Sequence, residues 1–147
     1  MLYLEDLQVG QRFVTATYEL TAAAITTFAA QFDPQPFHLS EEAAATSLFG
    51  ALAASGWHTA AVTMRLQVQS GPRICGGVIG ASAEVRWPQP TRPGDVLHVE
   101  SEVVSIIPSR SRPQRGMLRL RSETYNQRGE IVQSLTANLV VPRRVVP

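Results

Sequence analysis

The fold depends on residues 55–71, SGWHTAAVTMRLQVQSG, which predict the longest helix of the chain. Apolar side chains recur there on one helical stripe, formed by Trp57, Ala61, Met64 and Val68. The Gly71-Pro72 pair ends the helix. The uncharged stretch from 43 to 64 is too polar to span a membrane, which requires about 20 mostly apolar residues. We therefore expect a helix that is buried against the rest of the protein.

The residues that follow this helix predict strands. Apolar and polar side chains alternate from 79 to 87, which is the period of a strand. Further strands are expected over 96–107, 117–126 and 131–141, separated by a turn-rich connection, an arginine-rich loop at 109–116 and a tight turn at 126–129. Together they predict a four-strand antiparallel meander. Such a sheet can bury one face by wrapping around the long helix.

The first 50 residues predict one strand and two helices. Residues 12–20 alternate as a half-buried strand with Val14, Ala16, Tyr18 and Leu20 on the apolar face. Thr21 can cap a helix that must stop near Phe32, because prolines follow at 34 and 36. Ser40 can cap a short helix at about 41–47. The expected fold class is α+β, in a single domain over 1–147. A second copy is expected at a sheet edge or face that one helix leaves open.

Composition narrows the function classes. The chain has 147 residues, of which 44% are hydrophobic and 17% charged, with a net charge of +1, so it suits a packed domain and gives no field that attracts nucleic acid or membranes. The single cysteine, Cys75, cannot form an internal disulfide, and the start of the chain shows no signal peptide. These features predict a cytoplasmic protein. The three histidines are scattered, so no metal site is expected.

The segment FDPQPFH, residues 32–38, is the strongest candidate for chemistry. Asp33 and His38 lie five residues apart across a turn that two prolines stiffen. A carboxylate and an imidazole that hold one water molecule can deprotonate it and return a proton to a substrate. A structural alternative exists for each residue, because Asp-Pro is common in turns and a histidine beside Phe37 is often a buried side chain.

Gly56 is the candidate for stabilising negative charge. It lies at or near the start of the long helix, where backbone N–H groups are free and the helix dipole is positive. A glycine also allows a substrate oxygen to approach the N–H closely. The alternative is that Gly56 only permits close packing. His58, one turn into the helix, is better explained by packing or by a supporting hydrogen bond.

Over nearly its whole length the sequence resembles the MaoC-like dehydratases, which include the (R)-specific enoyl-CoA hydratases. Asp33 and His38 match the family's Asp-x-x-x-x-His motif, and Ser55-Gly56-Trp57 is similar to its His-Gly-Met helix start. The segments 86–95 and 126–130 resemble the connection between the family's second and third strands and its late hairpin. Three positions depart from the pattern, which are Gln35 in place of asparagine, Ser55 in place of histidine, and Met64 where some members have a hydroxyl.

The resemblance implies a hot-dog fold, a dimer, and hydration or dehydration of an acyl thioester of coenzyme A or acyl carrier protein, without a cofactor. It implies that Asp33 and His38 share the water during syn addition and that Gly56 binds the thioester oxygen. Candidate substrate-binding residues are Phe37, Ser55, Trp57, Arg110 and Arg112. The two arginines can bind coenzyme A phosphates, or they can belong to an ordinary solvated loop. Two alternative functions stay open, which are a hot-dog acyl-CoA thioesterase and a non-catalytic acyl-binding or partner subunit.

Overall fold

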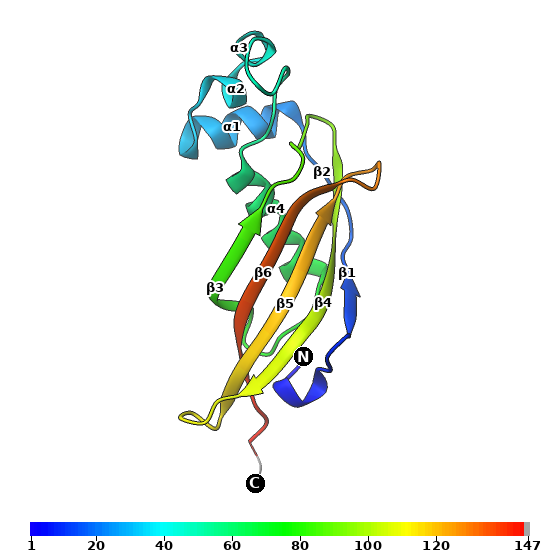
Figure 1. The fold of residues 1–147 in the computed structure, drawn as a ribbon, viewed down its shortest axis with the longest axis vertical. Helices are drawn as coiled ribbons and strands as arrows, with labels where there is room; N and C mark the ends of the chain where they lie inside the picture. Colours follow the sequence, from blue (N-terminus) through cyan, green and yellow to red (C-terminus); the bar gives the residue numbers. More distant parts are fainter. Residues whose placement is uncertain (146–147) are drawn as a thin grey trace.

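An antiparallel sheet wraps around one long helix in the computed structural model, which describes residues 1–145 (Figure 1). The helix is α4 (Gly56–Ser70), and Ser55 caps it by accepting a hydrogen bond from the Trp57 N–H. The strands are β1 (Arg12–Val14), β2 (Tyr18–Glu19), β3 (Ile79–Arg86), β4 (Val96–Pro108), β5 (Arg115–Tyr125) and β6 (Ile131–Pro142). This arrangement confirms the predicted α+β hot-dog architecture.

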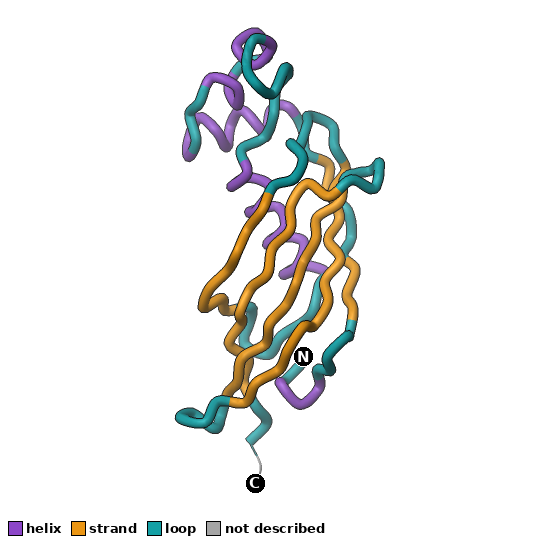
Figure 2. Tube along the Cα trace, viewed as in Figure 1, coloured by secondary structure: helices purple, strands orange, loops and turns teal. Residues whose placement is uncertain are grey.

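Three short helices gather at one end of the sheet (Figures 1 and 2). They are α1 (Ala22–Phe32), α2 (Pro36–Leu39) and α3 (Glu41–Ala45), and a 3₁₀ turn, η1 (Leu4–Asp6), lies near the other end. Thr21 and Ser40 cap α1 and α3, as predicted. The turn between Asp33 and His38 is partly helical. Pro36 occupies the first position of α2, which suits proline because an N–H at this position would have no hydrogen-bond partner within the helix.

Two predictions about the strands were wrong. The sheet order is β1-β4-β5-β6-β3, so β3 pairs with β6 and lies at the far edge from β1; only β4, β5 and β6 form a meander. The expected strand over 12–20 is two short strands, β1 and β2, that pair with different parts of β4. Val14 is exposed, whereas Thr15 is buried and its hydroxyl accepts a hydrogen bond from the Val99 N–H. Phe13 and Thr15 therefore face inward from the first half of this segment, and the break shifts the alternation so that Tyr18 and Leu20 face inward from the second half.

Helix α4 contacts the sheet through a face that the sequence did not predict. The stripe of Trp57, Ala61, Met64 and Val68 is exposed on the single chain. The buried face carries Val62 and Leu66 together with polar residues such as Thr63 and Gln67. A strip of polar side chains therefore runs between helix and sheet, formed by Thr63, Gln67, Ser101, Ser122, Thr124 and Gln133. Ser101 interrupts the buried face of β4 between Val99 and Val103, which belong to separate apolar clusters.

Candidate active site

Asp33 and His38 are in direct contact. Asp33 ends α1 and His38 lies on α2, and the intervening turn brings Nε2 of His38 to 3.3 Å from Oδ2 of Asp33. The His38 side chain is 5% exposed and that of Asp33 is 17% exposed, so both are largely removed from bulk water. The sequence motif therefore folds into one carboxylate–imidazole pair.

A backbone carbonyl fixes the other side of the His38 ring. Nδ1 of His38 lies 2.6 Å from the carbonyl oxygen of Ala53. Since a carbonyl oxygen only accepts hydrogen bonds, Nδ1 carries the proton. In a neutral His38 ring, Nε2 is then an acceptor that faces the carboxylate of Asp33.

The surroundings of Asp33 favour its ionised form. Burial raises the pKa of the Asp33 carboxyl group, but hydrogen bonds from the Ser55 hydroxyl and the Gln35 amide, together with the attraction of His38, lower it by more. The net effect is a pKa below the usual value for aspartate. The Gln35 contact is a bond from Nε2 to Oδ1 of Asp33, 2.7 Å long. Asp33 is therefore a hydrogen-bond acceptor at neutral pH.

Gly56 starts α4 beside this pair. Its N–H belongs to the first turn, where a helix supplies no acceptor, and within residues 1–145 no acceptor for it is found. The indole of Trp87 packs on the α-carbon, so a Cβ atom at position 56 would lie 2.6 Å from Cε2 of Trp87. Close packing and a free N–H therefore coexist at this glycine.

A cleft of about 230 Å³ lies between His38 and Gly56, and Asp33 reaches it only through its contact with His38. His38 and Phe49 line it on the side of the short helices, Ala54, Gly56 and Thr59 on the side of α4, and Trp87, Gln89, Pro90, Thr91 and Val132 on the side of the sheet. The lining is mostly apolar with few polar groups, as in small-molecule sites in general. Imidazole, free amide and cavity thus share one space.

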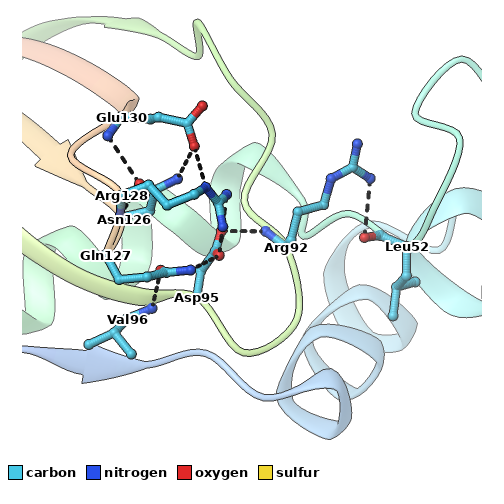
Figure 3. A network of polar contacts seen from close by, with 8 residues as sticks. All are labelled: Leu52, Arg92, Asp95, Val96, Asn126, Gln127, Arg128 and Glu130. Carbon is cyan, nitrogen blue, oxygen red and sulfur yellow. Dashed lines mark hydrogen bonds and ion pairs between the residues drawn. The ribbon is translucent and has the colours of Figure 1, made fainter.

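A network of polar contacts holds the loop that leads into α4 (Figure 3). The guanidinium of Arg92 donates to the carbonyl oxygens of Phe49 (2.7 Å), Ala51 (2.8 Å) and, at 3.4 Å, Leu52. The Arg92 N–H in turn donates to Oδ2 of the buried Asp95. Ala53, whose carbonyl orients His38, directly follows these residues. Arg92 thereby connects the sheet to the loop that positions the imidazole.

The β5–β6 turn completes this network. The Gln127 side-chain amide donates to the carboxylate of Asp95 over 3.0 Å. Arg128 lies 3.8 Å from the same carboxylate and pairs with Glu130 at 2.7 Å. The hairpin that the sequence predicted at 126–129 is confirmed, with Gly129 at a φ of 75°. Its side chains support Asp95, and through it Arg92.

The five predicted substrate-binding residues lie in three places, and none of them lines the cleft. Ser55 is fully buried beside Asp33, and Phe37 packs edge-on against the His38 ring at 4.5 Å. Trp57 is exposed outside the cleft and packs against Trp87, with ring centroids 5.1 Å apart. Arg110 and Arg112 are exposed in the β4–β5 loop, at the opposite end of the sheet from α1–α3 (Figure 1). Within one chain they are not part of the site.

Sequence reasoning missed several residues of the cleft. Phe49, Thr59, Thr91 and Val132 line it but belong to four separate stretches of sequence, and no local pattern links them. His58 was expected to pack or to supply a supporting hydrogen bond. It packs, stacking on Phe28 with ring centroids 4.4 Å apart, and its buried Nδ1 has no hydrogen-bond partner within residues 1–145. Burial lowers the pKa of His58, so its ring is neutral.

Two negative findings apply to residues 1–145. No group of three or more histidine, cysteine, aspartate or glutamate residues is arranged there to hold a metal ion. None of the helices in this part of the chain combines the length and the apolarity needed to cross a membrane.

Comparison with known proteins finds one matching family model and several similar dehydratases and hydratases. Residues 6–125 match the family model described as a MaoC like domain. The 3-hydroxybutyryl-CoA dehydratase of Methylorubrum extorquens is 35% identical over 114 residues, which are 76% of this chain and 70% of that protein. A MaoC-like dehydratase from Rhodospirillum rubrum is 61% identical, covers 99% of this chain and 100% of its own, and superposes with a TM-score of 0.97. The R-hydratase PhaJ1 from Pseudomonas aeruginosa is 28% identical, with coverages of 97% and 86% and a TM-score of 0.76.

Proposed function

The chain belongs to the MaoC-like dehydratase family, and on this premise we propose that it interconverts 2-enoyl and (R)-3-hydroxyacyl thioesters. The proposal depends mainly on one observation, the contact of Asp33 with His38 beside a cleft that Gly56 also lines. The relative from Methylorubrum extorquens is named for 3-hydroxybutyryl-CoA, which supports coenzyme A as the carrier.

The two side chains are suited to binding one water molecule. With Nδ1 bonded to Ala53, Nε2 of a neutral His38 ring is an acceptor, and ionised Asp33 is also an acceptor. Two facing acceptors repel each other unless a proton lies between them or a water molecule beside them donates to both. A water that donates one hydrogen to each group relieves this repulsion, and its oxygen lone pairs then point toward the substrate. This is the arrangement that general-base activation of water requires.

Water is then added across the C2–C3 double bond of the enoyl group. The water oxygen forms a bond to C3 of the enoyl group while the pair takes a proton from the water. The electrons of the C2–C3 double bond move toward the thioester carbonyl, and the pair returns a proton to C2. The free N–H of Gly56 binds the carbonyl oxygen as its negative charge develops, a contribution of about 3 kcal/mol to lowering the barrier. Asp33 and His38 act as a coupled unit in both proton transfers.

The protein is also proposed to work as a homodimer. β3 is the last strand of the sheet, and the edge that does not pair with β6 is open in the single chain. Beside it, exposed apolar side chains of α4 and β3 form a surface made of Trp57, Met64, Val68 and Ile79. A second copy that pairs along β3 would cover both the open edge and these side chains.

Hydration of crotonyl-CoA tests the proposed function. The conjugated double bond absorbs in the ultraviolet, so addition of water is seen as loss of that absorbance, and the product is expected to be (R)-3-hydroxybutyryl-CoA. Release of free thiol without loss of the double bond would indicate a thioesterase instead. Absence of both reactions on crotonyl-CoA and longer enoyl-CoAs would favour a non-catalytic subunit.

A further inference from the structure

Gln133 separates the cleft from a second cavity. The second cavity, about 40 Å³, lies farther along α4, between that helix and the sheet, and Thr63, Leu120, Leu135 and Leu139 are among its lining residues. Gln133 is fully buried and contacts a wall of each cavity. Its Oε1 accepts a bond of 3.0 Å from Nε1 of Trp87, which lines the cleft, and its Nε2 donates over 3.2 Å to the hydroxyl of Thr63.

An irregularity in the sheet places Gln133 there. The β5–β6 register shifts between Thr124 and Tyr125, which pair with Gln133 and Ile131, so Val132 is an extra residue. Val132 and Gln133 are both fully buried, although neighbours on a regular strand face opposite sides. The bulge lets Val132 line the cleft and Gln133 lie directly behind it.

The partition is polar, and each buried side-chain nitrogen and oxygen atom of Gln133 and Thr63 has a hydrogen-bond partner. The Thr63 hydroxyl, which accepts from Gln133, donates to the carbonyl oxygen of Thr59 over 2.9 Å and lies 2.6 Å from the hydroxyl of Thr124. An alkyl chain that passed from the cleft to the second cavity would have to break these buried bonds. Methylene groups cannot replace them.

The cleft alone holds little beyond the reacting end of a substrate. Its 230 Å³ is below the range of about 300–1,000 Å³ that is common for small-molecule pockets. We infer that the enzyme is selective for short acyl thioesters, such as crotonyl-CoA, over medium-length ones, such as 2-octenoyl-CoA, and that Gln133 sets this limit. This inference rests on the proposed function, since it assigns the cleft to the acyl group.

The variant Gln133→Ala tests the inference by joining the two cavities. We expect the wild type to hydrate crotonyl-CoA with a kcat/KM at least about 30-fold above that for 2-octenoyl-CoA. In Gln133→Ala this ratio is expected to fall about tenfold or more. Gln67→Ala is the matched control, because it truncates another buried glutamine, bonded to Ser101 and Ser122, and enlarges the second cavity, which Gln67 lines, without opening it to the cleft. It should leave the ratio unchanged. If Gln133→Ala does not fold, Gln133→Ser takes its place, because serine supplies a polar hydroxyl group where the amide of Gln133 was.

Binding of saturated thioesters separates this inference from the proposed reaction. Butyryl-CoA and octanoyl-CoA cannot be hydrated, and titration calorimetry is expected to show tighter binding of butyryl-CoA to the wild type and a smaller difference in the Gln133 variant. This result without hydration of crotonyl-CoA would support the size limit while refuting the hydratase. Equal use of both enoyl-CoAs by the wild type, or an unchanged ratio in a folded Gln133 variant, would overturn the inference.

Discussion

Asp33 and His38 derive their proposed role from the groups that surround them. The carbonyl of Ala53 sets the tautomer of His38, and hydrogen bonds from Ser55 and Gln35 keep Asp33 ionised. Two of the three positions that depart from the family pattern, Gln35 and Ser55, therefore contact the carboxylate directly. Gln35 and Ser55 replace the usual asparagine and histidine, but both supply hydrogen-bond donors to Asp33.

Loss of the Gln35 amide should shift the pH dependence of catalysis. The reaction needs ionised Asp33, so activity declines as the pH falls through the pKa of the pair. Gln35→Met removes a donor to the carboxylate and raises that pKa. We expect the acid limb of kcat/KM to move to higher pH.

The matched control for this shift is Gln69→Met. Gln69 is also exposed, but it lies near the far end of α4, so the same substitution should leave the profile unchanged. An acid limb of Gln35→Met that coincides with the wild type would contradict the assignment of Gln35 as a support for ionised Asp33.

At the scale of elements, local signals predicted most of the helices. The ends of α1, the caps Thr21 and Ser40 and the start of α4 at Gly56 follow from residues near one another in the chain. The Asp33–His38 contact could be predicted for the same reason, because the two residues lie five positions apart across a turn that contains two prolines. These features need no knowledge of tertiary contacts.

Features that depend on distant partners could not be predicted. Strand alternation cannot show that β3 pairs with β6, because register and order are decided by tertiary packing. The polar face of α4 is buried because Thr63 and Gln67 find partners on β5 and β6. Likewise, the role of Arg92 requires knowing that loop 49–52 lies beside it. Each is a pairing between residues tens of positions apart.

Arg92 is expected to act as a positioning residue through this loop. Arg92→Met removes the donors to the carbonyl oxygens of Phe49 and Ala51. The loop becomes less rigid as a result, and the same loop carries the Ala53 carbonyl that bonds to His38. We expect kcat to fall about tenfold with KM changed less than threefold, and stability to fall by about 1–3 kcal/mol. The ¹⁵N shifts of His38 should report a mixture of tautomers in place of the Nδ1–H form.

Arg121→Met provides the control for Arg92. Arg121 is exposed on β5 and pairs with Glu102 on β4, away from the loop. It should leave kcat and the His38 shifts as in the wild type. Unchanged tautomer signals in Arg92→Met, with lower stability alone, would show that Arg92 has a purely structural role.

The whole molecule is expected to assemble into a homodimer through the edge of β3. One helix covers only part of the sheet, and the apolar stripe of α4 is exposed beside the open edge of β3. Ile79→Glu places a charge on β3, where Ile79 is 57% exposed on the single chain. We expect sedimentation to show a dimer for the wild type and a monomer for this variant, because burying an unpaired carboxylate is costly.

Val14→Glu is the matched control for the dimer. Val14 is 61% exposed, but it lies on β1 at the other edge of the sheet. This variant should remain a dimer. A wild type that is monomeric at micromolar concentration, or loss of the dimer in Val14→Glu but not in Ile79→Glu, would contradict the proposed interface.

Asp33 and His38 are proposed to act as one unit on a shared water molecule. A double-mutant cycle with Asp33→Asn and His38→Gln measures this directly through kcat/KM on crotonyl-CoA. Each single change should lower kcat/KM by about 10²–10⁴. The kcat/KM of the double variant should lie within about tenfold of that of the less active single variant.

The chain contains its own control for this cycle, the pair of His98 and Glu100 on β4, whose Nε2 and Oε2 atoms lie 3.1 Å apart. The matching changes His98→Gln and Glu100→Gln should leave turnover unchanged. If either Asp33→Asn or His38→Gln retains activity within tenfold of the wild type, or if their losses simply multiply, the shared-water account is contradicted.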